Sequence, residues 1–348
     1  MKSIASAPAK IILFGEHFVV HGTKAILAAI DKRVTVTTTF TEKATIKINS
    51  QLGTIEVPIL SWYDKGANIE EVQPHITAPY EEVKSEFKPF VFLGGKIMSM
   101  REDSIVDYGL EITIDSDIPI GVGHGSSSAC CVAAAASMCE LCYSHASSLE
   151  LILDLAIEAE KTIFPDTSGA DCTICTYGGM IEHPSIEKID STFDLNLLIA
   201  NSMIPHSTKN SVEKVSKFKE NNEERFSQLC DLENGLIDEV ITAMKNNDAT
   251  TFGLKMSENQ KYLEEIQVSN DTLRDMISSL SEISLGSKIT GAGDGGCIIA
   301  LVNDDNMDKV PALLGKDKEC FSAKIDTKGV VRRWLTEESD DLGDDLDI

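Results

Sequence analysis

A short stretch rich in glycine and serine has the composition of an anion-binding loop. Gly121, Gly123 and Gly125 occupy alternate positions, and Ser126–Ser128 follow directly. Glycine lets backbone N–H groups approach a phosphate closely, and the start of a following helix adds unpaired N–H groups and a positive dipole. Serine hydroxyls can hold phosphate oxygens or a magnesium ion. The stretch therefore predicts phosphate binding, with a plain surface loop as the alternative.

Three charged side chains elsewhere could complete a site for phosphoryl transfer. A helix N-terminus stabilises an anion by about 0.3–2 kcal/mol, whereas enzymes lower barriers by about 8–23 kcal/mol. Such an enzyme therefore also needs a cation, a carboxylate for the metal and a group that positions the nucleophile. Lys10 stands at the entry to an apolar strand, where its charge is costly unless paired. Glu160 ends a helical pattern, and Asp171 lies eleven residues later, after a turn at Ser168 and Gly169.

Separate strands and helices must bring these side chains together, because the sequence places them far apart. Near alternation of β-branched residues predicts strands at 35–40, 45–48 and 109–114. Small apolar residues predict a buried helix at 126–142. A capping box formed by Ser147 and Glu150 predicts the start of the helix that carries Glu160.

Amphipathic helical patterns dominate the second half of the chain. They cover 207–220, 223–247, 249–266 and 271–283. Further on, the sequence predicts strand, tight turn and strand over 287–302, a short helix at 307–314 and a strand at 320–326. Strands mixed with groups of helices, rather than strict alternation, indicate the α+β class in both halves.

The change of character along the chain predicts two domains. We expect an N-terminal α+β domain over 1–183, which holds the phosphate loop, and a C-terminal α+β domain over 184–336. Residues 337–348 carry seven acidic groups and no Lys or Arg, which predicts a solvated, mobile tail.

The charge and hydropathy of the chain exclude several classes of partner. A formal net charge of −25 at pH 7 argues against nonspecific binding to nucleic acid or to an anionic membrane. No stretch approaches the ~20 apolar residues that span a bilayer, and the N-terminus lacks a secretory pattern. We therefore expect a cytoplasmic protein that keeps its nine cysteines mostly reduced.

Two pairs of cysteines leave a hypothesis of another class open, a thiol–metal protein. Cys139 with Cys142 and Cys172 with Cys175 could supply four zinc ligands. The first pair lies in a helical pattern, where thiols pack well. The second lies in 171–179, which we interpret as a strand or turn. Packing is therefore the preferred interpretation, and zinc analysis of the purified protein tests it.

Several separated motifs together resemble the GHMP kinase superfamily and, within it, the mevalonate kinase family. The similar segments are Ala7–Gly22, Pro119–Ala129, Ile204–Val215, Glu258–Ser269 and Lys288–Cys297, together with Glu160 and Asp171 at their spacing of eleven. The family is chosen mainly on Gly15–His17 followed by FVVHG, since galactokinases and phosphomevalonate kinases resemble other patterns at this point. Residues 51–89 and the acidic tail lie outside the resemblance.

The resemblance implies a two-domain α+β fold with the active site in the cleft between the domains. It implies ATP-dependent phosphorylation of the 5-hydroxyl of (R)-mevalonate to 5-phosphomevalonate, in isoprenoid precursor biosynthesis, with Mg²⁺ as cofactor and a homodimer as the assembly. Asp171 would face the hydroxyl, with Lys10 beside it and the transferred group. By the same carry-over, Ser127 and Glu160 would hold Mg²⁺, and Glu16, His17 and Thr208 would lie on the mevalonate side. The implied ATP contacts are Pro119, Ile120, Gly121, Val122, Gly123, His124, Gly125, Ser126, Ser127, Ser128, Gly291 and Gly293.

Four positions depart from the usual motifs of this family. Ala9 replaces a glycine, and Thr167 replaces a proline, which predicts a less rigid turn before Asp171. Asp294 replaces a glycine, and its carboxylate should repel a triphosphate unless it points away or meets a cation. His124 replaces a leucine, either as a packing substitute or as a pH-dependent extra cation for ATP. These departures leave a second hypothesis open, a related GHMP kinase with a different acceptor.

Overall fold

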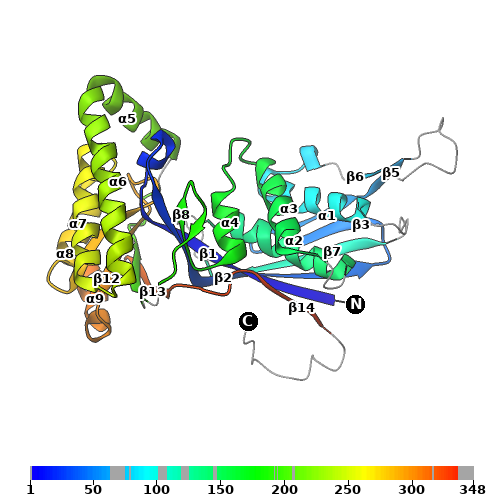
Figure 1. The fold of residues 1–348 in the computed structure, drawn as a ribbon. Coiled ribbons are helices and arrows are strands. Elements are labelled where there is room, and N and C mark those ends of the chain that lie inside the picture. Colours follow the sequence, from blue (N-terminus) through cyan, green and yellow to red (C-terminus); the bar gives the residue numbers. More distant parts are fainter. Residues whose placement is uncertain are drawn as a thin grey trace.

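The computed structural model describes residues 2–62, 75–77, 80–100, 108–118, 125–143, 147–191, 193, 195–205, 208–315 and 317–335. Figure 1 shows an elongated molecule, in which a sheet-rich part on the right joins a part with several long helices on the left. Two long strands, β1 (Lys2–Phe14) and β2 (Ala25–Thr41), run from the first part towards the second. The end of β1 and the start of β2 therefore lie where the two parts meet.

An eight-stranded sheet forms the framework of the first part. Its order is β14-β1-β2-β7-β3-β4, and β8 and β9 extend it from β2. The described pairs are antiparallel except β3 with β7, which is parallel. The remaining strands are β3 (Thr45–Ser50), β4 (Gly53–Pro58), β7 (Gly109–Ser116), β8 (Met180–His183), β9 (Glu187–Lys188) and β14 (Val331–Leu335); a separate pair is formed by β5 (Leu60–Trp62) and β6 (His75–Thr77).

One buried helix, α2 (Ser126–Tyr143), fastens the other helices of this part to the sheet. It lies against β1 and β2 and contacts α1 (Lys88–Ser99), α3 (Leu149–Lys161) and α4 (Ala170–Tyr177). Its middle, Ala133–Ala136, is completely buried, as expected of a helix that is apolar on all sides. The first turn of α2 is thereby fixed relative to β1.

A four-stranded antiparallel sheet forms the framework of the second part, in the order β11-β12-β10-β13. The strands are β10 (Asn196–Asn201), β11 (Ser284–Thr290), β12 (Cys297–Val302) and β13 (Glu319–Lys324). The helices are α5 (Thr208–Asn221), α6 (Glu223–Lys245), α7 (Ala249–Glu265), α8 (Asp271–Ser279) and α9 (Val310–Leu314). Short 3-10 helices occupy Phe18–His21, Tyr80–Glu82, Ser85–Phe87 and Asp304–Lys309. Helix α7 approaches β11 so closely that a Cβ atom on Gly286 would lie 1.8 Å from the Gly253 oxygen.

Most expected elements are confirmed, but the interpretation of 171–179 as a strand or turn is wrong. Residues Ala170–Tyr177 form α4. The Thr173 hydroxyl donates to the Gly169 oxygen at 2.9 Å, and the Thr176 hydroxyl donates to the Cys172 oxygen at 2.8 Å. These bonds to the preceding turn let threonines, which locally favour strands, fit a helix.

The predicted capping box does not form, and the capping serine lies one residue later than expected. Ser148, rather than Ser147, caps α3, since its side chain accepts a hydrogen bond from the Leu151 N–H at 3.2 Å. The chain also returns to the first sheet near its end, because β14 pairs with β1. The domain boundary between His183 and Pro184 stays a prediction, and the acidic tail lies outside the described residues.

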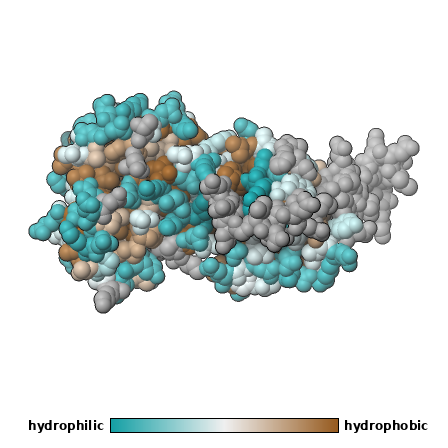
Figure 2. All heavy atoms as spheres, turned by 90° about the horizontal axis from the view of Figure 1, so that it is seen from below, coloured by the Kyte–Doolittle hydropathy of each residue, from teal (hydrophilic) through white to brown (hydrophobic). Residues whose placement is uncertain are grey.

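The surface of the described residues is largely hydrophilic on the face in Figure 2. Hydrophobic residues on this face gather mainly over the part that holds the four-stranded sheet. Among the described residues, no helix combines the length and the apolar character that crossing a membrane requires.

Candidate active site

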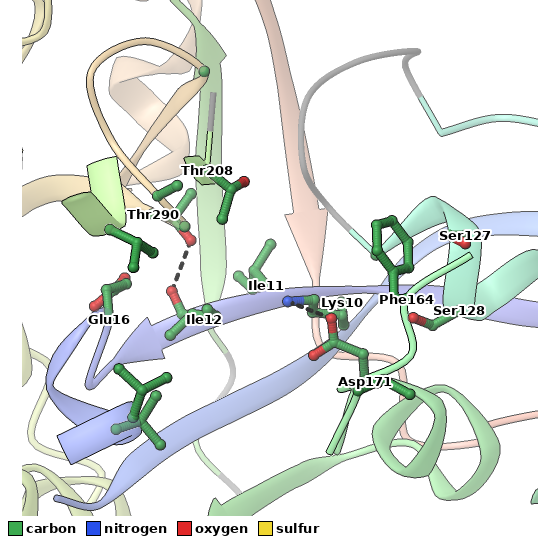
Figure 3. A pocket seen from close by; sticks show the side chains of 18 of the residues that line it. Lys10, Ile11, Ile12, Glu16, Ser127, Ser128, Phe164, Asp171, Thr208 and Thr290 are labelled. Carbon is green, nitrogen blue, oxygen red and sulfur yellow. Dashed lines mark hydrogen bonds and ion pairs between the residues drawn. The ribbon is translucent and has the colours of Figure 1, made fainter. Parts of the chain in front are cut away.

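A cavity of about 770 Å³ lies where the two parts of the molecule meet. Figure 3 shows side chains from β1, the start of α2, α4 and the second part pointing into it. All of the described residues that were predicted for the site line this cavity. They are Lys10, Glu16, His17, Gly125, Ser126, Ser127, Ser128, Glu160, Asp171, Thr208, Gly291 and Gly293.

An ion pair between Lys10 and Asp171 forms one wall of the cavity (Figure 3). The Lys10 Nζ lies 2.9 Å from the Asp171 Oδ2, and the two side chains are 8% and 35% exposed. The lysine stem packs against Gly125. A Cβ atom on Gly125, whose φ is +67°, would lie 2.5 Å from the Lys10 Cγ. Glycine at this position therefore lets the loop and the lysine approach each other.

The position of Asp171 follows from the turn that begins α4. Gly169 caps this helix in the left-handed conformation, with φ of +76°. Asp171 lies in the first turn, where the helix dipole favours a carboxylate. Its carboxylate is partly exposed to the cavity while remaining in contact with Lys10. A substrate hydroxyl can therefore reach it.

Glu160 lines the cavity and is held by two hydroxyl groups. Ser128, in α2, donates a hydrogen bond to Oε1, and Thr167 donates one to Oε2 at 2.7 Å. Glu160 is only 4% exposed. Ser127 also lines the cavity from the first turn of α2. The predicted metal residues therefore share one side of the cavity with Lys10 and Asp171.

The predicted phosphate loop is described only in its last part. Gly125 precedes α2, and Ser126–Ser128 form its first residues. The other predicted ATP contacts, Pro119, Ile120, Gly121, Val122, Gly123 and His124, lie outside the described residues. Both hypotheses for His124 therefore remain predictions.

The glycine-rich turn between β11 and β12 closes the cavity from the second part. Gly291 and Gly293 have φ of +77° and +70°, and a Cβ atom on Gly293 would lie 2.1 Å from the Val268 oxygen. Asp294 follows with φ of +58°, and its Oδ2 lies 2.5 Å from the Nζ of Lys214 in α5. The carboxylate that seemed unfavourable beside a triphosphate therefore meets a cation.

His17 joins the end of β1 to this glycine turn. Its Nε2 lies 2.8 Å from the Ala292 oxygen, and burial lowers the pKa of its ring. Because a carbonyl oxygen can only accept, the proton of the neutral ring is on Nε2. Thr208, at the start of α5, points into the same region of the cavity in Figure 3.

Glu16 has a different environment from the other predicted substrate residues. Its carboxylate is completely buried and ion-paired with Lys288 of β11. Burial raises the pKa of the Glu16 carboxyl, and the Lys288 charge opposes that rise. The sequence contained a signal for this pair, since Lys288, like Lys10, is a lysine in an apolar strand. Nothing in the sequence near Lys288 identifies its partner, which is 272 residues away.

A second, apolar cavity of about 300 Å³ adjoins the start of α2. Phe164 lines both cavities and is 55% exposed. The other apolar residues around the second cavity include Leu52, Phe87, Phe90, Ile114, Ile118 and Ile163. Apart from a polar rim that includes Ser126 and Ser127, this cavity suits a flat, largely apolar group.

The cysteine pairs do not form a metal site within the described residues. Cys139, Cys172 and Cys175 are buried, and Cys142 is partly buried. Burial raises the pKa of Cys139 to about 12. Among the described residues, no group of three or more His, Cys, Asp or Glu side chains could hold a metal ion. The described cysteines of these pairs therefore act as small apolar packing groups.

Comparisons with known proteins agree with this architecture. A family model described as the GHMP kinases N terminal domain matches residues 95–179, and one described as GHMP kinases C terminal matches 240–314. The mevalonate kinase of Thermococcus sibiricus is 31% identical over 321 residues, which cover 90% of this chain and 93% of that protein. The mevalonate kinase of Arabidopsis thaliana is 30% identical over 381 residues, covering 94% and 99%.

A solved structure shows the same arrangement in three dimensions. The crystal structure of the Methanococcus jannaschii mevalonate kinase has a TM-score of 0.76 and 26% sequence identity, covering 93% of this chain and 98% of that one. The two-part α+β fold and the cavity between the parts therefore define a GHMP kinase. The similarity of this chain to mevalonate kinases over nearly its whole length identifies a narrower family within that class. The chain belongs to the mevalonate kinase family.

Proposed function

We propose that this chain transfers the γ-phosphoryl group of ATP to the 5-hydroxyl of (R)-mevalonate in the cavity between its two parts. The observation that carries the proposal is the Lys10–Asp171 ion pair, which faces the cavity beside the first turn of α2. Relatives named mevalonate kinase at about 30% identity support the acceptor. A complex of a more distant family member with (R)-mevalonate supports the same fold.

Asp171 orients the acceptor hydroxyl and receives its proton. The hydroxyl oxygen bonds to the γ-phosphorus while the bond to the β,γ-bridging oxygen breaks. Because this transition state is loose, position and charge stabilisation contribute more than strong base catalysis. The proton therefore passes late to Asp171. Lys10, at 2.9 Å from Asp171, supplies positive charge to both the carboxylate and the transferred group.

The surroundings of Glu160 fit a magnesium ion. Its buried carboxylate accepts hydrogen bonds from hydroxyls, and within the described residues no Lys or Arg forms an ion pair with it. A buried, uncompensated carboxylate is costly. Mg²⁺ is commonly bound by one or two carboxylates together with substrate phosphates. Glu160 and Ser127 would hold the ion, which when bound neutralises charge on the β- and γ-phosphates.

The two cavities suit the two ends of ATP. The phosphates would lie against Gly125 and the N–H groups that begin α2, with Gly291 and Gly293 opposite. The apolar cavity that Phe164 borders would take the base, since it adjoins Ser126 and Ser127. Base and triphosphate would then meet at the start of α2.

Mevalonate would occupy the end of the large cavity near His17 and Thr208, both of which line it. The proposed role of Glu16 differs from a direct contact. Its carboxylate is sealed against Lys288, so Glu16 would shape this end of the cavity by holding β11 against the end of β1.

An assay of ATP consumption with different acceptors tests the proposal. We expect phosphorylation of (R)-mevalonate, with ³¹P and ¹H NMR placing the phosphate on the 5-oxygen. Phosphomevalonate, homoserine and galactose should be turned over at least ~100-fold less efficiently. Preference for another acceptor would support the related-kinase hypothesis instead. The cytoplasmic location and the homodimer stay predictions. Cell fractionation can test the location, and analytical sedimentation can test the homodimer.

A further inference from the structure

The carboxylate of Glu160 is gripped by hydroxyls from two different elements. Ser128 reaches Oε1 from α2, and Thr167 reaches Oε2 from the turn between α3 and α4. Glu160 itself lies near the end of α3 and is only 4% exposed. Each oxygen thus has a donor, and the plane of the carboxylate is fixed from two sides.

The Thr167 hydroxyl has a defined direction. Its single proton points to Glu160 Oε2, to which the hydroxyl donates at 2.7 Å. A lone pair of the same oxygen accepts the Gly169 N–H at 3.3 Å. Gly169 in turn begins α4, which carries Asp171. One hydroxyl therefore connects the carboxylate at the end of α3 with the turn that places Asp171.

We propose that Thr167 is a positioning residue for the magnesium carboxylate: it fixes Glu160 so that the remaining lone pairs face the bound cation. This inference rests on the proposed Mg²⁺ site at Glu160 and Ser127. Thr167 also lines the large cavity, so its side chain lies beside the space that the metal and the phosphates would occupy. A proline, which the family motif usually has here, carries no hydroxyl and could not make this contact.

The expected size of the effect follows from metal sites in general. Loss of a hydrogen bond to a ligating carboxylate typically costs 10–100-fold in metal affinity or activity. Thr167→Val keeps the shape of the side chain but removes the donor, so Glu160 can turn away from the cation. Thr167→Ser keeps the hydroxyl. A merely structural role for the methyl group would reverse the order of these two variants.

Nearby Thr162 provides a matched control. It lies directly after α3, and its hydroxyl donates to the Ala159 oxygen at 2.6 Å. Thr162→Val therefore removes a hydroxyl from the same helix end without touching the Glu160 carboxylate.

The test measures Mn²⁺ binding by electron paramagnetic resonance in the full chain with a non-hydrolysable ATP analogue. Thr167→Val should bind Mn²⁺ about 10-fold or more weakly, whereas Thr167→Ser and Thr162→Val should stay close to the unmodified chain. Affinity for the analogue without metal should be unchanged. If Thr167→Val does not fold, Thr167→Ala decides in the same way. Unchanged Mn²⁺ affinity in the folded Val or Ala variant overturns the inference.

A second measurement separates this inference from the function on which it rests. The unmodified chain and Glu160→Gln are compared in the same titration. Analogue-dependent Mn²⁺ binding that is lost in Glu160→Gln but retained in Thr167→Val contradicts the role of Thr167 alone. Binding that survives in Glu160→Gln contradicts the proposed metal site, and the inference about Thr167 with it.

Discussion

Two buried lysines pair with carboxylates at the junction of the two parts, in opposite surroundings. Lys10 meets Asp171 in the wall of the large cavity, where 35% of the aspartate side chain is exposed. Lys288 meets Glu16 where neither side chain has any exposed surface. The chemical groups are alike, but only the first pair can touch a substrate through its carboxylate.

The difference indicates a division of roles between the pairs. The open pair, Lys10 with Asp171, joins β1 to the start of α4 and leaves a carboxylate free to accept a proton. The sealed pair, Lys288 with Glu16, joins the end of β1 to β11 across the two sheets. Close by, the Thr290 hydroxyl also donates to the Ile12 oxygen at 2.8 Å. We therefore expect the open pair to govern turnover and the sealed pair to govern stability.

The largest effect is expected from breaking the sealed pair. Lys288→Met leaves the Glu16 carboxylate buried without its cation, which typically costs about 3–5 kcal/mol of folding free energy. Chemical denaturation measures this loss. Lys24→Met is the matched control, since its pair with Asp238 is half-exposed and should contribute less than ~1 kcal/mol. A similar small loss in both variants would show that Lys288 is not structurally required.

Removing the charge of the open pair should act on chemistry instead. Asp171→Asn should lower kcat at least ~100-fold, because a neutral amide cannot take up the proton of the hydroxyl. ATP affinity should change far less. The free energy of unfolding should fall by less than in Lys288→Met, since the oxygen of the new amide can still accept from Lys10 at the edge of the cavity. Steady-state kinetics and denaturation on the same preparation check both halves of the expectation. Turnover within a few-fold of normal would remove Asp171 from the reaction.

A pH effect is expected around the sealed pair. Glu233 of α6 lies near it, and Asn259 donates to both of its oxygens at 2.8 and 2.7 Å. Burial, together with the Glu16 charge, raises the pKa of Glu233 to about 7. Because the folded protein holds this proton more tightly than the unfolded chain, the raised pKa contributes folding free energy. This contribution is fully present below pH 4.5, the ordinary pKa, and is lost as the pH rises through 7.

The unmodified chain should therefore lose stability relative to Glu233→Gln as pH increases from about 5 to 8. Melting temperatures of both proteins over this range should differ by a few degrees more at the upper end. Parallel curves would show that Glu233 does not titrate in this window.

The smallest effect is expected at the partly exposed pair of Lys214 and Asp294. Surface pairs are worth about 0.2–1 kcal/mol, so Lys214→Met should weaken ATP binding roughly two- to fivefold by uncovering the Asp294 charge. Asp294→Asn in the same background should restore the affinity. Failure of that second change to restore ATP binding would mean that the aspartate faces away from the phosphates.

Much of the site could be predicted because its reactive residues lie in short sequence motifs. Lys10, Gly125, Glu160 and Asp171 stand in short patterns whose residue types already limit what they can do. The helices of the second half could be predicted equally well, since their amphipathic patterns are long and regular. These features depend on residues close together in the sequence.

The contacts that could not be predicted depend on how distant segments meet. The partner of Lys288 is 272 residues away, and the sequence does not encode that distance locally. The turn before α4 places the Thr167 hydroxyl against Glu160. From the sequence, Thr167 predicted only a less rigid turn. Helix α4 was missed because its threonines favour strands locally, whereas contacts with α2 and β1 stabilise a helix there.

The division between the open and the sealed pair is tested most directly by one variant, Lys10→Met. The methionine keeps the stem that packs under Gly125 but removes the charge. We predict that its single-turnover rate of mevalonate phosphorylation falls at least ~100-fold, while its free energy of unfolding stays within about 1 kcal/mol of the unmodified chain. A near-normal rate, or a large loss of stability with the rate intact, would contradict this account.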